Sequence, residues 1–383
     1  MNWKRITVLS PSLTLTSIVA LSSALAKIAQ AFPEVSVSAV QMLTTLPSFI
    51  AVVVILLSGY LSSWLRKKRI VVISVGLMLA GGLMPLVFHQ NFTQLIFAGI
   101  VFGLGYGGVS PMTTALIHEH YSQAEQPAML GFQSAVIGIG GVLFSYLGGK
   151  LAAVCWWYAY FSYLLFIPVF LLVLRLPEGD LAKQESRSFR NLLNGKLLFY
   201  LGQGVVFAAF FYVFQTNLAL LVEARGLGGA QTAGSVLSTQ SAVGILSGIL
   251  GGKILGKLKN MSLACIFAVS GLALLLIYLS GSLVPIYIAA ACLGFVFSLR
   301  MPAGYLKATS SVGPECATLA ITVYCSFSQV GQFLSPLCIN GLADLAGGSL
   351  EMKFLLSALV LLLAGAVSAV WELQAGPSPK KVK

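Results

Sequence analysis

Twelve long stretches of this chain carry no charged residue and consist mainly of apolar side chains. A helix that crosses a bilayer needs about 20 such residues, and continuous apolar runs, unlike the alternation of a barrel strand, predict helices. The runs cover residues 6–26, 37–65, 71–88, 92–117, 127–149 and 151–174, and then 197–222, 227–252, 261–279, 283–299, 316–343 and 354–371. The sequence therefore predicts an all-α integral membrane protein with twelve transmembrane helices.

The composition excludes the common classes of soluble protein. Of the 383 residues, 57% are hydrophobic and only 9% are charged, whereas a soluble domain carries about 25% charged residues. Twelve membrane helices would use roughly 240 residues, so the connections are short and no large domain stands outside the membrane. The six cysteines show no Cys-x-x-Cys spacing. We interpret them as buried thiols and expect no disulfide framework, metal or other cofactor.

The first apolar run has some features of a signal peptide. Lys4 and Arg5 precede it, and Ala24-Leu25-Ala26 resembles a cleavage site between small residues. Removing this run would leave an odd number of membrane helices. We therefore interpret it as the first membrane helix.

The basic residues gather in clusters between the apolar runs, and this distribution predicts the orientation. A net charge of +12 would suggest nucleic acid in a soluble protein, but cytoplasmic loops of membrane proteins are also rich in Lys and Arg. With a cytoplasmic N-terminus, 18 basic residues fall on the inner side: Lys4, Arg5, Arg66, Lys67, Lys68, Arg69, Arg175, Lys183, Arg187, Arg190, Lys196, Lys253, Lys257, Lys259, Lys307, Lys380, Lys381 and Lys383. The four on the outer side are Lys27, Lys150, Arg225 and Lys353. We expect a multi-pass protein of the cytoplasmic (inner) membrane with both termini cytoplasmic and no nucleic-acid partner.

One hydrophilic connection is longer than the others and divides the apolar runs six and six. It covers residues 175–196, between an N-terminal six-helix bundle (1–174) and a C-terminal six-helix bundle with a short basic tail (197–383). Phe189, Leu192 and Leu193 stand among basic residues there. The segment forms either a short amphipathic helix on the inner leaflet or a flexible linker.

Two basic loops occupy equivalent positions in the two halves. The second run closes with Gly59-Tyr60-Leu61-Ser62-Ser63-Trp64-Leu65-Arg66-Lys67-Lys68-Arg69, and the eighth with Gly252-Lys253-Ile254-Leu255-Gly256-Lys257-Leu258-Lys259-Asn260. Together with the twelve runs and the long central segment, this pattern resembles the major facilitator superfamily. The loop between helices two and three of that family reads G-x-L-A-D-R-x-G-R-R and recurs weakly between helices eight and nine. The resemblance implies two pseudo-symmetric bundles around a central cavity, alternating access, and a gating loop formed here by Gly59, Ser63, Arg66, Lys67, Lys68 and Arg69.

Three features depart from the family pattern. Ser63 stands where the signature has Asp, so the charge interaction that latches one conformation is absent or replaced. Gly99 aligns with the Arg that many proton-coupled members carry in the fourth helix. The segment from Phe144 to Gly149 lacks the Gly-Pro of the antiporter pattern. These differences weaken an assignment to the drug/proton antiporters.

Glycines recur at intervals of four on two predicted helices: Gly99, Gly103 and Gly107, and Gly244, Gly248, Gly252 and Gly256. Small residues at this interval let helix backbones approach closely. Gly103-x-Gly105-x-x-Gly108 also matches the dinucleotide fingerprint, but that motif requires a preceding strand. We interpret these glycines as packing positions.

Arg300 is the one ionisable residue well inside an apolar run, in Phe297-Ser298-Leu299-Arg300-Met301-Pro302. An Arg at mid-bilayer costs roughly 2.5–3.5 kcal/mol on insertion scales. It therefore either faces a cavity and binds substrate, or lies five or six residues from the inner end of its helix and extends to the headgroups.

Proton coupling has one candidate group. Glu119 lies between His118 and His120 at the cytoplasmic end of the fourth run, and His titrates near neutral pH. The alternative interpretation is a solvated helix end, and the spacing fits no zinc motif.

Uncharged polar residues within the apolar runs are candidates for the remainder of a substrate site: Gln133, Tyr212, Gln215, Asn217, Gln240, Gln329 and Gln332. Amides in membrane helices equally bond neighbouring helices.

These features predict a secondary active transporter for a small organic solute, with proton coupling as one option. Efflux of amphipathic drugs and uniport or exchange of organic anions are the alternatives. The chain has no Gly-x-x-x-x-Gly-Lys-Ser/Thr loop for ATP and no catalytic dyad at one membrane depth, so we do not expect an enzyme. A channel or a receptor is a third class. We expect a monomer whose partners are the lipid bilayer and the solute.

Overall fold

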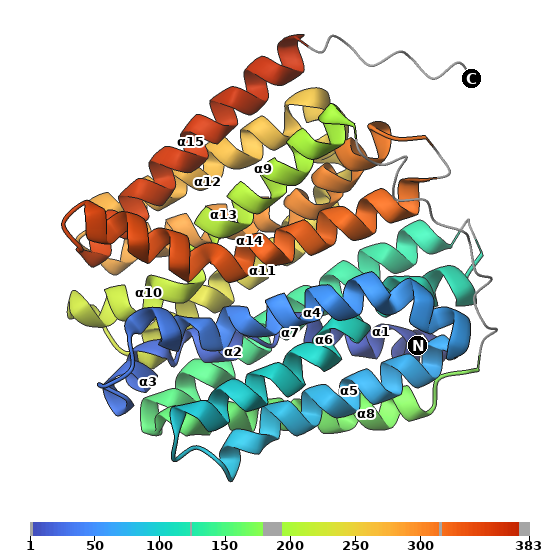
Figure 1. Cartoon of the computed structure of the whole chain (residues 1–383), viewed down its shortest axis with the longest axis horizontal. Coiled ribbons are helices and arrows are strands. Elements are labelled where there is room, and N and C mark those ends of the chain that lie inside the picture. The colour runs from blue at the N-terminus through green and yellow to red at the C-terminus, as the bar shows by residue number, and fades with distance from the viewer. Residues whose placement is uncertain (1–2, 123–124, 179–193, 314–315, 375–383) are drawn as a thin grey trace.

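The computed structural model describes residues 3–122, 125–178, 194–313 and 316–374, and every regular element within these ranges is a helix. The α-helices are α1 (Trp3–Leu9), α2 (Val19–Ser22), α3 (Leu25–Ala31), α4 (Val37–Trp64), α5 (Lys67–Leu83), α6 (Phe92–His120), α7 (Gln126–Val154), α8 (Phe166–Leu174), α9 (Gly195–Phe211), α10 (Val213–Ala224), α11 (Ala230–Leu258), α12 (Ser262–Leu279), α13 (Leu283–Ser310), α14 (Ala317–Leu345) and α15 (Leu350–Gln374). Short 3₁₀ turns join or extend them: η1 (Ser10–Thr16), η2 (Met84–Leu86), η3 (Trp156–Leu165) and η5 (Lys259–Met261). The long helices lie lengthwise beside one another (Figure 1).

The described helices group into twelve consecutive segments that run back and forth. Ten stretches are long and apolar enough to cross a membrane. One of the ten, residues 230–279, contains both α11 and α12, and the amide-rich α14, with 29 residues, is not among them. The predicted all-α membrane fold is confirmed. The predicted segment around Phe189, Leu192 and Leu193 lies outside the described residues.

The first segment is broken because its polar residues and Pro11 compete with regular α-helical bonding. The hydroxyls of Ser10, Thr14 and Ser17 donate to carbonyls three residues earlier, at 3.0, 2.8 and 2.6 Å. Pro11 has no N–H to donate. These hydroxyl groups satisfy carbonyls that water cannot reach in a bilayer, and the segment forms a 3₁₀ turn between Ser10 and Thr16.

Several helix ends differ from the charge-free runs, because a single charged residue does not end a helix. Helix α7 ends at Val154, so Lys150 lies in the helix and not in a loop. Helix α15 begins at Leu350, and Lys353 is buried in its first turn. Helix α13 extends to Ser310, so Arg300 lies ten residues before its end and the expected five or six was wrong.

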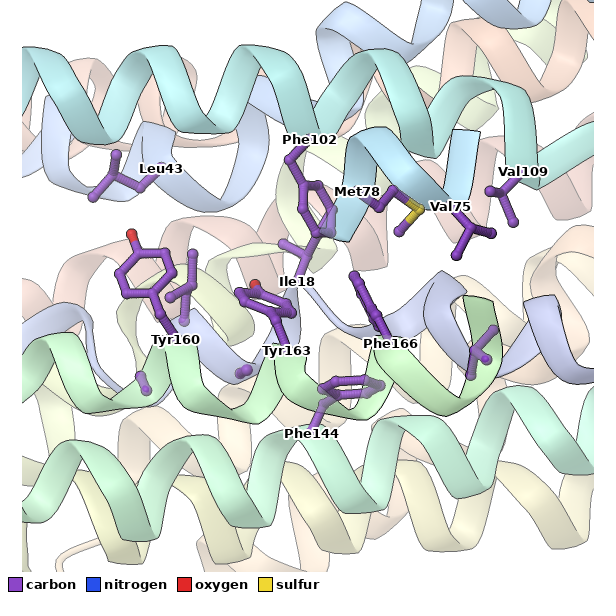
Figure 2. Packing of buried hydrophobic residues seen from close by; sticks show 14 of the residues in the cluster. Ile18, Leu43, Val75, Met78, Phe102, Val109, Phe144, Tyr160, Tyr163 and Phe166 are labelled. Carbon is purple, nitrogen blue, oxygen red and sulfur yellow. The ribbon is translucent and has the colours of Figure 1, made fainter. Parts of the chain in front are cut away.

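The two largest hydrophobic cores of the described residues divide the helices. One lies almost entirely within residues 8–176, and the other almost entirely within residues 200–361. We call α1–α8 the N-terminal bundle and α9–α15 the C-terminal bundle. Figure 2 shows the first core, where the rings of Phe102 and Phe166 pack against Tyr163 with centroids 5.4 Å apart in both pairs. The Phe144 ring of α7 packs edge-to-face against Phe166, with ring centroids 5.5 Å apart, and so joins α7 to the same cluster.

The bundles meet along α7 and α11. A Cβ on Gly149 would lie 2.6 Å from the Ala230 carbonyl, and one on Gly234 would lie 2.6 Å from the Ser145 carbonyl. The helices therefore approach too closely for any other residue at either glycine. Further along, the hydroxyls of Ser145 and Ser238 are hydrogen-bonded at 2.9 Å. The contact follows the small-residue packing rule of membrane helices.

Because the segments number twelve, the described chain begins and finishes at the same end of the bundles (Figure 1). We call the end that contains Trp3 and Gln374 the near end. The other, where α3 meets α4 and α14 meets α15, is the far end.

Candidate functional site

Arg300 lies in the middle of α13 and is only 4% exposed. Its guanidinium stands over the Phe207 ring of α9, with Cζ 5.2 Å from the ring centroid. The buried Nε and Nη1 atoms have no hydrogen-bond partner, and no described carboxylate forms an ion pair with them. A buried polar atom without a partner costs about 1–3 kcal/mol, and more when it is charged. The structure therefore leaves two strong donors available to an added acceptor.

Four phenols and a thiol lie within electrostatic range of this guanidinium: Tyr106, Tyr212, Tyr305, Tyr324 and Cys325. The Tyr305 hydroxyl and the Cys325 sulfur are hydrogen-bonded at 2.7 Å. The Tyr106 hydroxyl, from the N-terminal bundle, lies beside the Gln329 side chain of α14. We call Arg300, Phe207 and these five residues the Arg300 cluster. It draws side chains from both bundles.

Gln203 is a second buried polar group without a partner. It lies one helical turn before Phe207 on α9 and is 8% exposed, and neither of its amide atoms has a hydrogen-bond partner. Residues four apart share a helix face, so Gln203 lies on the side of α9 that carries Phe207. The sequence analysis did not select Gln203 or Tyr305. The signal in the sequence that could have found Gln203 was its place in an apolar run, four residues before Phe207.

The amides selected from the sequence separate into different places. Gln329 adjoins the Arg300 cluster through Tyr106. Gln133 donates to the Thr114 hydroxyl inside the N-terminal bundle at 3.4 Å. Gln240 is buried on α11 where its backbone touches Gly294, and its Nε2 has no partner. Gln215 and Gln332 are also buried.

Asn217 belongs to a hydrogen-bonded group that joins the bundles near the far end. Gln41 of α4 donates to the Asn217 side chain at 2.8 Å and to the Thr216 carbonyl at 3.2 Å. Asn340 of α14 donates to the side-chain oxygen Oε1 of Gln41 at 2.7 Å and to the Ser38 hydroxyl at 2.8 Å. We call these five residues the far-end amide cluster. Its amide side chains are 0–7% exposed, so the bonds form away from water.

The predicted proton-coupling residues and gating loop lie at the near end. Lys67 pairs with Glu119 at 3.2 Å, which fastens the start of α5 to the end of α6. Arg66 pairs with Glu178.

The two flanking histidines have separate contacts. His118 Nδ1 is hydrogen-bonded to Gln126 at 2.8 Å, and Lys4 donates to the His120 carbonyl at 2.8 Å. The described contacts therefore join Glu119 to Lys67 and not to Arg300.

Two bundles of apolar helices meet around a buried arginine that has no ion-pair partner among the described residues. This arrangement is typical of polytopic membrane transporters. The sequence model of the Major Facilitator Superfamily matches residues 7–336. The chain belongs to the major facilitator superfamily, as the sequence resemblance indicated, and it is a secondary transporter and not an enzyme.

Solved transporters share the fold over nearly the whole chain. An auto-inhibited peptide transporter of the POT family aligns with a TM-score of 0.79 and 13% identity, covering 100% of this chain and 99% of its own. A bacterial homologue of the human lysosomal transporter Spinster, inward-facing and unoccupied, has a TM-score of 0.74 and 14% identity over 99% of each chain. A mutant of the nucleoside transporter NupG has a TM-score of 0.75 and 14% identity over 98% of this chain and 99% of its own. At these identities the likeness establishes the fold alone.

Proposed function

We propose that this transporter carries a small organic anion, which binds at the Arg300 cluster and is exposed on the two sides of the membrane in turn. The observation that carries this proposal is the buried guanidinium with two unpartnered nitrogens. A carboxylate could accept charge-assisted hydrogen bonds from these buried N–H groups, and its side-on form would pair Nε–H with the adjacent Nη2–H. The anion would thereby neutralise a charge that the membrane interior disfavours.

The ring of phenols supports an anion over a cation. Tyrosine hydroxyls can donate to a carboxylate, and the apolar faces of Phe207 and the tyrosines suit an organic skeleton. No described carboxylate stands at this depth to hold an amine. Of the amphipathic drugs whose efflux was an alternative from the sequence, cationic ones are therefore disfavoured. Proton coupling at Glu119, His118 and His120 remains a prediction.

Counterflow in proteoliposomes tests this function. Vesicles loaded with unlabelled benzoate are diluted into buffer that contains labelled benzoate, at a pH where the acid is ionised. We expect saturable, transient accumulation of label, since a carrier exchanges solute across one site. Preloaded benzamide and benzylamine, which share the ring but not the charge, should not drive it. Equal counterflow with benzylamine would contradict an anion site, and non-saturable equilibration would indicate a channel.

We further propose that the near end is cytoplasmic and that the protein is a monomer in the cytoplasmic membrane. The charge asymmetry supports this orientation, because the basic loops after α4 and α11 both lie at the near end. A membrane-impermeant maleimide added to cells should label cysteine at the exposed far-end positions Glu34 and Asp344. It should not label cysteine at Lys257, which is exposed near the other end. Wild-type cells report the background from native cysteines, and external labelling at position 257 would reverse the orientation.

A further inference from the structure

We propose that Glu372 is a proton-binding site at the near end of the C-terminal bundle, and that its protonation strengthens anion binding at Arg300. The proton site stands on its own geometry, whereas its coupling to the anion rests on the proposed function. The sequence analysis assigned no role to Glu372 or to its partner Lys307.

Glu372 and Lys307 form a buried ion pair between α15 and α13. Lys307 Nζ lies 2.7 Å from Glu372 Oε2, and the side chains are 11% and 4% exposed. The Tyr200 hydroxyl of α9 donates to Glu372 Oε1 at 2.8 Å. Lys307 also stands over the Tyr200 ring, 5.9 Å from its centroid, and donates to Asn260 at 3.5 Å. Both oxygens of the Glu372 carboxylate therefore have partners inside the protein. Loss of either partner would leave a buried charge uncompensated, which is strongly unfavourable.

The surroundings contain cations and phenols but no second described acid. Helices α9, α10, α12 and α14 and turn η5 pack against α15. In the near half, these elements carry the titratable groups Lys196, Tyr200, Lys259, Cys265, Tyr324 and Cys325. The acidic residues Glu223, Asp344 and Glu351 of the described C-terminal bundle lie at the far end. A proton that enters this region therefore has one described carboxylate to bind.

Pro302 gives the ion pair a way to break. It lies inside α13 between Arg300 and Lys307, and because proline has no N–H, the Ser298 carbonyl lacks its usual helical donor. Bending there would carry Lys307 away from α15 while the far part of α13 stays packed. Once the ammonium has moved away, the buried carboxylate is neutralised by taking up a proton on Oε2.

The proton changes the charge that Arg300 and its anion experience. The pair goes from zero to a net charge of +1, because Glu372 becomes neutral and Lys307 keeps its ammonium. Lys307 follows Arg300 by seven residues, two turns along the same face of α13, or about 10.5 Å along the axis. At an effective dielectric constant of about 20, one added charge at this distance strengthens binding of a monoanion by about tenfold. Linkage requires the anion to strengthen proton binding equally.

Infrared difference spectroscopy of the full-length protein tests the proton site without any ligand. Lowering the pH should produce a carboxylic-acid C=O band in the wild type that is missing in Glu372→Gln, which keeps an acceptor for Tyr200. The matched control is Glu223→Gln, which alters an acid paired with Lys27 at the far end and should keep the band. Persistence of the full band in Glu372→Gln would overturn the proposal. Lys307→Met provides a second variant: the band should appear at higher pH, and an unchanged pH dependence would also count against the site.

Benzoate affinity, measured by thermal stabilisation between pH 5.5 and 8, tests the coupling. We expect about tenfold tighter binding at the acid limit in the wild type and in Glu223→Gln, and a flat profile in Glu372→Gln. An identical pH dependence in Glu372→Gln would reject the coupling. Absence of benzoate binding at every pH would reject the anion site, while the infrared result would still decide the proton site.

Discussion

Arg300→Ala is expected to weaken benzoate binding at least tenfold and to reduce counterflow accordingly. Removing one partner of a desolvated charge pair costs about 2–5 kcal/mol, and Arg300 is the described cation at the centre of the candidate site. Arg300→Lys should be intermediate, because it keeps the charge but loses the planar fork that holds a carboxylate through two bonds. The measurement is ligand-dependent thermal stabilisation of the purified protein, combined with initial rates of counterflow.

The stability of the ligand-free transporter distinguishes a role of Arg300 in substrate binding from a role in helix packing. In Arg300→Ala the melting temperature without ligand should change little or rise, because an unpaired buried charge has been removed. Arg175→Ala is the matched control, since it removes an exposed arginine that stands over the Trp3 ring, away from the Arg300 cluster, and should leave benzoate affinity unchanged. Wild-type affinity in Arg300→Ala would assign this residue to its contact with Phe207. A large fall in the melting temperature without ligand would indicate a structural charge.

Gln41→Ala is expected to shift the transporter toward a conformation that is open at the far end. The substitution removes three hydrogen bonds that join the bundles, two donated by Gln41 and one accepted from Asn340. Each contributes about 1 kcal/mol, and the Asn217 and Asn340 amides left behind regain water only if the far end opens. The open fraction relative to the closed fraction should therefore rise roughly a hundredfold. Spin labels at the exposed positions Glu34 and Asp344, one in each bundle, would report a longer distance.

A second amide substitution controls for general loosening. Gln133→Ala removes a buried amide that bonds Thr114 within the N-terminal bundle and joins nothing across the interface. It should leave the distance distribution between the labels unchanged. The same distribution in Gln41→Ala as in the wild type would show that the remaining contacts between the bundles, including the glycine contacts of α7 and α11 and the Lys27–Glu223 ion pair, suffice to hold the far end closed.

The sequence determined the membrane fold and the family, because both depend on properties that accumulate along one stretch of chain. A run of about 20 apolar residues can satisfy its backbone in a bilayer only as a helix, so the runs predicted the helical segments before any contact was known. The basic loop from Gly59 to Arg69 carried the resemblance to the major facilitator superfamily. The sequence left two interpretations of Arg300, a cavity or the headgroups, and only the structure shows that it is buried. Helix ends were less predictable, since α7 and α15 extend past Lys150 and Lys353, whose charges the sequence placed in loops.

The tertiary structure alone decided which polar residues meet. Gln41 reaches Asn340 across 299 positions of the chain, and Glu372 reaches Tyr200 across 172. Neither distance leaves a local pattern in the sequence. Phe207 likewise lies beneath Arg300 only because α9 and α13 pack together. Apolar runs of many different sequences form helices in a bilayer. A hydrogen bond or ion pair, however, needs two atoms within about 3 Å of each other. Only the packing of the bundles sets that distance.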